Sequence, residues 1–187
     1  PLMAGALGRL GVATTYIGAV GREDEPYLLH PLYHELQRRC RMVIPVAPPA
    51  HTDALEFVDG KVMLGKTKNI QSVTWESLKA SFGLARLTAM VGECTLVAVV
   101  NWVMMGGVES IWAGLATEVL PTLPRSSRPR LFFDLCDPAK RSSEDLVRAL
   151  RFIVATPSYT GDTIIVDGGE HLTGRPRDIA FDLKKKK

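Results

Sequence analysis

The stretch Thr95-Leu-Val-Ala-Val-Val-Asn101 decides the fold class that this sequence predicts. Residues 96–100 are continuously apolar, as is typical of a parallel strand that is buried on both faces of a sheet. Asn101 interrupts the apolar run, and a buried amide needs hydrogen-bond partners. The sequence therefore predicts a central strand whose carboxyl end carries a polar side chain.

Strands and helices are expected to alternate on either side of this run. Hydrophobic periodicity and cap signals predict strands over 13–20, 42–46 and 130–135, and helices over 2–10, 27–39, 75–90, 108–120 and 142–153. Such alternation predicts βαβ units, whose right-handed crossovers place helices on both faces of the sheet. The expected fold is α/β, a three-layer sandwich with a mostly parallel sheet.

One segment departs from this alternation. Asp59-Gly60 lies between two strand-like runs, and such a pair is a strong hairpin signal because a tight turn needs positive φ. The segment is too polar on one side for a central strand. We therefore expect a β-hairpin flap over 54–64, at the edge of the sheet or protruding from it.

The composition and the net charge limit the kinds of molecule that the protein is expected to bind. The chain has 187 residues, of which 46% are hydrophobic and 23% charged, as in one ordinary globular domain with or without a dependent tail. The formal charge is +3, and removing the four lysines at 184–187 leaves −1. The body of the protein is therefore not a nucleic-acid surface, and the lysine run is expected to be a solvated tail.

The cysteines and the apolar runs bear on location. Cys40, Cys94 and Cys136 are odd in number and far apart, which argues against a disulfide framework and favours a cytoplasmic, reducing compartment. Cys94 and Cys136 lie in or beside apolar runs and are expected to be small core residues. No signal peptide is visible, and the longest apolar run is too short to span a bilayer, so we expect no membrane partner.

Three polar residues are the candidate substrate contacts. Ligands of open parallel sheets gather beyond the carboxyl ends of the strands, where Asn101 and Asp134 follow two apolar runs. Asp53 leads into the expected hairpin. These side chains could bind hydroxyls of a small sugar-like ligand. Alternatively, Asn101 satisfies nearby backbone groups, and Asp134 with Asp137 shapes a turn before the next helix.

No catalytic or metal-binding residue is predicted with these candidates. His30 and His34 stand four apart with Cys40 beyond them, but a fourth zinc ligand is not evident, and surface or packing histidines are expected. Gly106-Gly107 precedes a helix, whose amides could bind an anion, although a simple turn is favoured. The other glycine loops lack both the dinucleotide and the phosphate-loop fingerprints.

Residues 1 to about 150 resemble the PfkB/ribokinase family of carbohydrate kinases. The resemblance is carried by Ala4-Gly-Ala-Leu-Gly-Arg-Leu-Gly11, Thr15-Tyr-Ile-Gly-Ala-Val-Gly21, Thr52-Asp-Ala-Leu-Glu-Phe57, Asn101-Trp102 and Phe132-Phe-Asp-Leu-Cys-Asp-Pro138. It implies an α/β core with a small β lid over the sugar, to which the flap at 54–64 would belong. It also implies transfer of the γ-phosphoryl group of ATP to a sugar hydroxyl, with Mg²⁺.

The resemblance to that family is incomplete in this sequence. The family's catalytic base is the Asp of a late Gly-Ala-Gly-Asp motif, and Thr160-Gly-Asp162 is the nearest approximation here. The early strand with its sugar-binding di-glycine turn and the nucleotide site are not found. Phosphoryl transfer depends on positioning and charge stabilisation. The resemblance therefore implies a catalytically incomplete fragment or chimera, with a homo-oligomer as one possible assembly.

From about residue 150 onward, the chain resembles the C-terminus of short-chain dehydrogenase/reductases near pteridine reductases. The resemblance is carried by Ala155-Thr-Pro-Ser-Tyr-Thr-Gly161 and Ile164-Ile-Val-Asp-Gly-Gly169. It implies a closing strand over 162–166, with the basic tail, packed on the same domain at 151–187, and NADPH as cofactor. That family's Tyr-x-x-x-Lys pair is absent, because Thr163 stands four residues after Tyr159. A non-enzymatic or engineered α/β fold is the third alternative.

Overall fold

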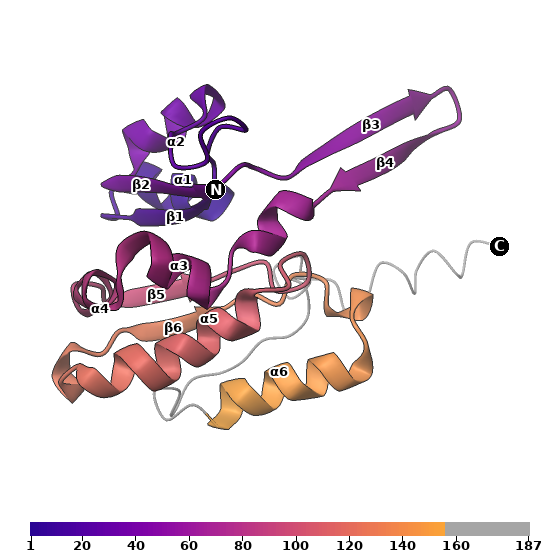
Figure 1. Ribbon diagram of the computed structural model, residues 1–187. Helices are drawn as coiled ribbons and strands as arrows, with labels where there is room; N and C mark the ends of the chain where they lie inside the picture. Colours follow the sequence, from indigo (N-terminus) through magenta and orange to yellow (C-terminus); the bar gives the residue numbers. More distant parts are fainter. Residues whose placement is uncertain (156–187) are drawn as a thin grey trace.

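The computed structural model describes residues 1–155, which form an α/β fold with parallel strands and a protruding hairpin (Figure 1). Strand β1 (Thr15–Ala19) pairs in parallel with β2 (Met42–Ala47), and β5 (Leu96–Val99) pairs in parallel with β6 (Arg130–Phe133). Within the described residues the two pairs are separate ladders. The predicted α/β class with mostly parallel strands is confirmed.

Helices cover both faces of the β1–β2 pair. On one face, α1 (Leu2–Arg9) and α2 (His34–Arg39) bury a small cluster against the strands, formed by Ala4, Leu36 and Cys40 with Tyr16, Tyr33 and Val43. Ile17 and Ala19 of β1 pack instead into the main core, which lies among α3 (Trp75–Phe82), α4 (Leu84–Gly92) and α5 (Val108–Gly114). Because side chains of a strand alternate between faces, β1–β2 is the middle of three layers.

The β5–β6 pair is covered on one face by described elements. Val97 and Leu131 pack into the main core, and Phe133 also contacts a second cluster around Trp102 and Trp112. Helix α6 (Ser143–Ala155) joins this second cluster through its buried Ala149 and Ile153. These contacts all lie on the core-facing side of the two strands.

The opposite face of β5–β6 carries side chains that residues 1–155 leave half open. Leu96 of β5 is 47% exposed, and Phe132 of β6 is 42% exposed. The prediction that residues 96–100 are buried on both faces is therefore wrong for the part of the chain that the structure describes. The apolar run indicates that both faces of the strand are hydrophobic, but it does not indicate which neighbouring elements cover each face.

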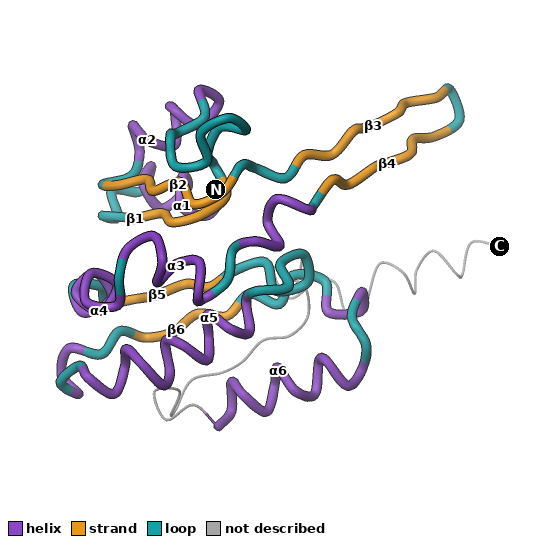
Figure 2. The backbone as a smooth tube through the Cα atoms, in the orientation of Figure 1, coloured by secondary structure: helices purple, strands orange, loops and turns teal. Residues whose placement is uncertain are grey.

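The predicted hairpin is present and extends further than its sequence signal. Strands β3 (His51–Phe57) and β4 (Gly60–Lys66) are antiparallel and project away from the body of the domain (Figures 1 and 2). Phe57 pairs with Gly60, so the two-residue turn is Val58-Asp59 and Gly60 is the first residue of β4. Exposed apolar side chains line it: Leu55, Phe57, Val58, Val62, Met63 and Leu64.

Most predicted helices are present, with breaks that have local causes. Gly83 adopts a φ of 74° and divides the expected helix over 75–90 into α3 and α4. The expected helix over 27–39 begins only at Pro31, because Leu29 forms an isolated bridge with Gly21. The remaining short helices are η1 (Pro31–Tyr33), η2 (Lys68–Ser72), η3 (Leu115–Val119), η4 (Leu120–Thr122), η5 (Arg125–Ser127) and η6 (Pro138–Lys140).

Two further sequence predictions concern the C-terminal region and membranes. The closing strand predicted over 162–166 and the basic tail lie outside the described residues. Within residues 1–155, helices long and apolar enough to cross a bilayer are absent. The three cysteines are free thiols.

We predict that Gly114→Ala lowers the free energy of unfolding by about 1–3 kcal/mol, the usual cost of overpacking a well-packed core. A Cβ at Gly114 would lie 2.1 Å from the indole ring of Trp75, which is buried. Urea denaturation measures the change. Gly65→Ala is the matched control, because a Cβ at that position meets no atom within 4 Å. Equal effects of the two substitutions would contradict this account of the core.

Candidate functional site

The loops that follow β5 and β6 are joined through the carboxylate of Asp134. Its Oδ1 accepts a hydrogen bond from the Cys136 amide at 2.8 Å, and its Oδ2 accepts a longer one from the Asn101 amide at 3.4 Å. The amide of Trp102 donates to the main-chain oxygen of Asp134 at 3.2 Å. The structure thus brings together two of the three candidate site residues, and the turn-shaping alternative for Asp134 describes these contacts.

Two residues of these loops have left-handed backbone conformations. Asn101 has a φ of 71° and Cys136 a φ of 62°, and residues other than glycine adopt such values rarely and at a cost in energy. The Asp134 carboxylate holds both residues through their amides. Cys136 is exposed, so its prediction as a core residue is wrong. The left-handed turn after β6 directs residue 136 out of the core.

The backbone and the side chain of Asn101 differ in their contacts. Asn101 is half-buried, its main-chain oxygen accepts from Met104 and Met105, and its amide nitrogen is held by Asp134. Within residues 1–155 its side-chain carboxamide makes no hydrogen bond. The alternative in which this side chain satisfies nearby backbone groups is therefore not what the described residues show. The carboxamide offers both donors and an acceptor.

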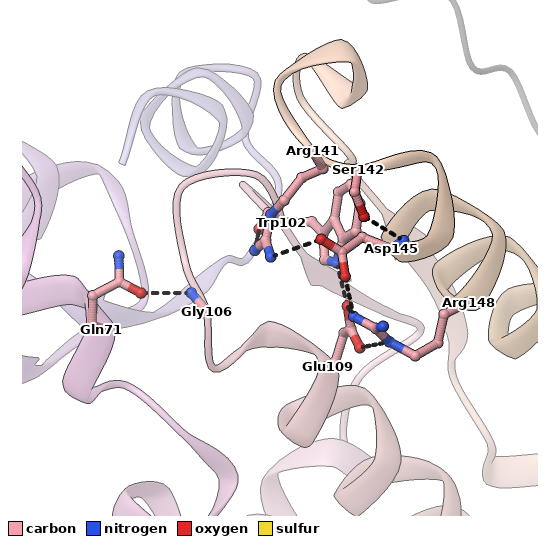
Figure 3. A network of polar contacts seen from close by, with 8 residues as sticks. All are labelled: Gln71, Trp102, Gly106, Glu109, Arg141, Ser142, Asp145 and Arg148. Atoms are coloured by element: carbon pink, nitrogen blue, oxygen red, sulfur yellow. Dashed lines mark hydrogen bonds and ion pairs between the residues drawn. The ribbon is translucent and has the colours of Figure 1, made fainter.

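Beneath this turn, Trp102 anchors the loop in the second hydrophobic cluster. The indole is fully buried, and its Nε1 donates to Glu109 Oε1 at 3.0 Å. The guanidinium of Arg141 lies 4.8 Å from the centre of the indole ring and donates to the Trp102 main-chain oxygen at 2.9 Å (Figure 3). A cation over an indole face is attracted by the ring quadrupole. The residue after Asn101 is thus fixed by packing and by polar contacts.

An ion-pair network ties α6 to α5 beside this indole. Arg148 donates to Glu109 Oε2 at 2.8 Å and to Asp145 Oδ1 at 2.6 Å (Figure 3). The Arg148 guanidinium holds the pKa of the Glu109 carboxyl below its usual range, and the Trp102 indole lowers it further. At the start of α6 the Ser142 hydroxyl accepts from the Asp145 amide at 3.1 Å, as the capping signal predicts.

Gln71 fixes the same loop from the opposite side. It lies in η2, directly after the hairpin, and its Nε2 donates to the Met104 oxygen at 2.8 Å. Its Oε1 accepts from the Gly106 amide at 2.8 Å. The predicted turn at Gly106-Gly107 is present, and a Cβ at Gly107 would lie 2.1 Å from the Val73 oxygen. The glycine pair therefore permits close docking of the segment that follows the hairpin.

Asp53 lies apart from the other two candidates. It sits in β3 near the base of the hairpin and forms an ion pair with Lys66 at 2.7 Å. The hydrogen bond from Lys66 lowers the pKa of the Asp53 carboxyl. Within residues 1–155, hydrogen bonds and ion pairs do not join Asp53 to Asn101 or Asp134. Any shared contact with a ligand depends on the position of the hairpin.

The implied cofactors are ATP with Mg²⁺ for a kinase and NADPH for a reductase. Clusters of three or more His, Cys, Asp or Glu that could hold a metal ion are absent from residues 1–155. Binding of ATP with Mg²⁺ stays a prediction. His30 Nδ1 accepts from the Leu32 amide at the start of η1, in keeping with a structural histidine. Binding of NADPH and assembly into a homo-oligomer also stay predictions.

Sequence comparison identifies the family. A sequence model of the family described as prokaryotic ketohexokinase matches residues 2–156. The chain belongs to the prokaryotic ketohexokinase family. A curated relative, a ketohexokinase of Haloferax volcanii, is 30% identical over 122 residues, which are 65% of this chain and 31% of that protein. The chain thus matches less than a third of this relative's length. No solved structure matches the chain.

Family membership confirms one of the two sequence resemblances. The carbohydrate-kinase ancestry predicted for residues 1–150 is confirmed, and the match continues through the expected join near residue 150. Helix α6 also runs without a break through 148–152. The comparisons give no support to the reductase resemblance, whose closing strand lies outside the described residues.

Sequence reasoning missed the polar groups that support the site. The fold brings together Trp102, Glu109 and Arg148, which lie up to 46 residues apart in the sequence. The sequence around these residues gives no reason to single them out, because an indole in an apolar run and charged residues on amphipathic helices are common. Gln71 likewise lies 35 residues from its partner Gly106. Sequence patterns within one helix or strand do not indicate which distant side chains will form hydrogen bonds or ion pairs.

We predict that the ion pairs of Arg148 make stability fall at acidic pH. The pKa of Glu109 lies below its ordinary value of 4.5 and that of Asp145 below 3.8, so their stabilisation is complete above pH 4.5. It is lost as the pH falls through the two folded-state values. Arg148→Gln should flatten this decline in unfolding free energy, measured by urea denaturation between pH 6 and about 2.5.

The control for that experiment is Arg86→Gln. Arg86 stacks on Phe82 and has no ion pair within residues 1–155, so its removal should leave the acid-side decline unchanged. An equal decline in Arg148→Gln and in the unmodified protein would contradict the prediction.

We predict that Asp134→Ala lowers the unfolding free energy by about 2 kcal/mol, because it removes a charged acceptor from two backbone amides. Asp134→Asn should lose less, since its remaining oxygen can still accept from Cys136. Thermal and urea unfolding measure both changes. Asp137→Ala is the control, because its exposed carboxylate pairs only with Lys140 within the described residues. A similar loss in the control would show that Asp134 has no special role.

Proposed function

We propose that this protein binds a ketohexose at the carboxyl ends of β5 and β6, as the sugar-binding part of a ketohexokinase-type carbohydrate kinase. The observation that carries the proposal is the Asn101 carboxamide, held in a strained turn with no hydrogen-bond partner within residues 1–155. Strained residues with free polar groups are concentrated at ligand sites. The substrate class follows from the description of both the family and the Haloferax volcanii relative as ketohexokinases.

Each candidate site residue would have a separate role in binding the sugar. Asn101 would exchange hydrogen bonds with sugar hydroxyls through its donors and its acceptor. Asp134 would orient Asn101, since its carboxylate is already engaged by two amides. Asp53 would reach the sugar from the hairpin once its carboxylate leaves Lys66. The exposed apolar side chains of the hairpin would then exclude water from the bound sugar.

Phosphoryl transfer is a separate part of the proposal. In a carbohydrate kinase, a sugar hydroxyl attacks the γ-phosphorus of ATP, the bond to the β-phosphate oxygen breaks, and the hydroxyl proton passes to a base. Residues 1–155 contain no cluster of three or more His, Cys, Asp or Glu side chains that could hold a metal ion. Because the family's Gly-Ala-Gly-Asp motif is not found in the sequence, we propose sugar binding without phosphoryl transfer.

We predict that isothermal titration calorimetry detects D-fructose binding and that Asn101→Ala weakens it about tenfold. Loss of the carboxamide removes hydrogen bonds that contribute about 0.5–1.5 kcal/mol each. Gln37→Ala removes an exposed amide from α2 and should leave the affinity unchanged. Absence of fructose binding by the unmodified protein, or full affinity in Asn101→Ala, would overturn the proposed site.

A coupled assay with Mg-ATP and D-fructose tests the missing transfer step. We expect no ADP above the rate without sugar. Turnover that Asp162→Asn abolishes would contradict the incomplete catalysis, while the calorimetric result would still decide the binding site.

A further inference from the structure

We propose that Gln71 is a positioning residue that fixes the hairpin relative to the Asn101 turn, an inference that rests on the proposed function where it concerns sugar binding. The two candidate contacts Asp53 and Asn101 lie on separate elements that share no direct hydrogen bond or ion pair within residues 1–155. Gln71 is the side chain that connects these elements. It lies five residues after β4 ends at Lys66, and it grips the loop that Asn101 begins.

The chemistry of this grip requires a carboxamide. Gln71 donates from Nε2 to the Met104 oxygen at 2.8 Å. Its Oε1 accepts from the Gly106 amide, also at 2.8 Å (Figure 3). A primary amide has a donor and an acceptor side by side and can satisfy both backbone groups at once. A carboxylate could accept but not donate, and an aliphatic side chain could do neither. The two bonds restrain η2 in more than one direction.

A second side chain of η2 connects the segment to the opposite loops. The Asn69 carboxamide donates to the Pro49 oxygen and to Glu23 Oε1, both at 3.2 Å. Pro49 lies in the linker that enters the hairpin, and Glu23 follows β1. Helix η2 therefore holds the entry to the hairpin through Asn69 and the loop after β5 through Gln71. Both contacts lie beside the carboxyl ends of the parallel strands.

The partner of Gln71 is firmly held by the rest of the domain. Trp102 is buried in the second cluster, Arg141 covers its ring, and Arg148 joins Glu109 to α6. Among residues 1–155, in contrast, the two strands of the hairpin pair only with each other, and the hairpin projects from the domain (Figure 1). Of the two elements that Gln71 joins, the loop is the fixed reference and the hairpin is the part free to change direction.

Loss of this grip should alter orientation more than stability. Gln71 is exposed, so its hydrogen bonds exchange readily for bonds to water and their net contribution to folding is small. Segments with few buried contacts move independently of the global fold. A variant that lacks the carboxamide should therefore fold normally while its hairpin samples more directions.

Distances between spin labels test the inference directly. One nitroxide is placed at Val58→Cys on the hairpin turn and one at native Cys136, in a Cys94→Ser background with Cys40 buried. Pulsed electron paramagnetic resonance then gives the distance distribution. Gln71→Met should raise the population outside the reference distance about tenfold, as expected from the loss of two neutral hydrogen bonds. The control Gln37→Met should reproduce the reference distribution. Identical distributions in all three proteins would overturn the positioning role.

Titration of the unlabelled proteins with D-fructose provides the functional readout. Gln71→Met should raise the Kd about three- to tenfold, and Gln37→Met should leave it unchanged. A broadened hairpin with unchanged affinity would overturn the connection between positioning and sugar binding. If the unmodified protein does not bind fructose, the proposed function fails, and the distance measurement still decides the role of Gln71.

Discussion

The contact on which the candidate site depends is the carboxylate of Asp134 with the amides of Asn101 and Cys136. One charged acceptor joins the loops after two neighbouring parallel strands, and both amides belong to residues with left-handed backbone. Such conformations persist only where surrounding contacts offset their cost. With the carboxylate in place, the Asn101 side chain is displayed at the edge of the sheet. Without it, the two left-handed residues would lose the hydrogen bonds from their amides to this carboxylate.

Two sets of contacts hold the loop after β5, one on the side of α6 and one on the side of the hairpin. On the α6 side, the support is the fully buried indole of Trp102, with Glu109 and Arg141 as partly exposed charged partners. On the hairpin side, it is neutral and exposed, through the carboxamide of Gln71. A packed, buried indole resists rearrangement, whereas exposed neutral hydrogen bonds exchange with water at little cost. The support on the α6 side is therefore the firmer of the two.

Membership of the prokaryotic ketohexokinase family gives this arrangement a functional setting. Carbohydrate kinases must hold a flexible, hydroxyl-rich substrate and keep water away from the transferred phosphoryl group. On the proposed function, the Asn101 carboxamide beside the buried Trp102 would serve the first requirement, and the apolar hairpin would serve part of the second. The family match, which covers residues 2–156, includes all of these elements.

The sequence by itself determined the features that local physics controls. The hairpin, the Ser142 cap and the parallel pairing around residues 96–100 follow from turn chemistry, capping and hydrophobic periodicity, whereas the break of the 75–90 helix at Gly83 appears only in the structure. Tertiary structure decided which distant groups meet: Asp134 with Asn101, Glu109 with Arg148, and Gln71 with Gly106. It also decided that Cys136 is exposed and that β5 is half open on one face. A sequence pattern records the preference of each segment, whereas contacts across more than 30 residues depend on how the segments pack.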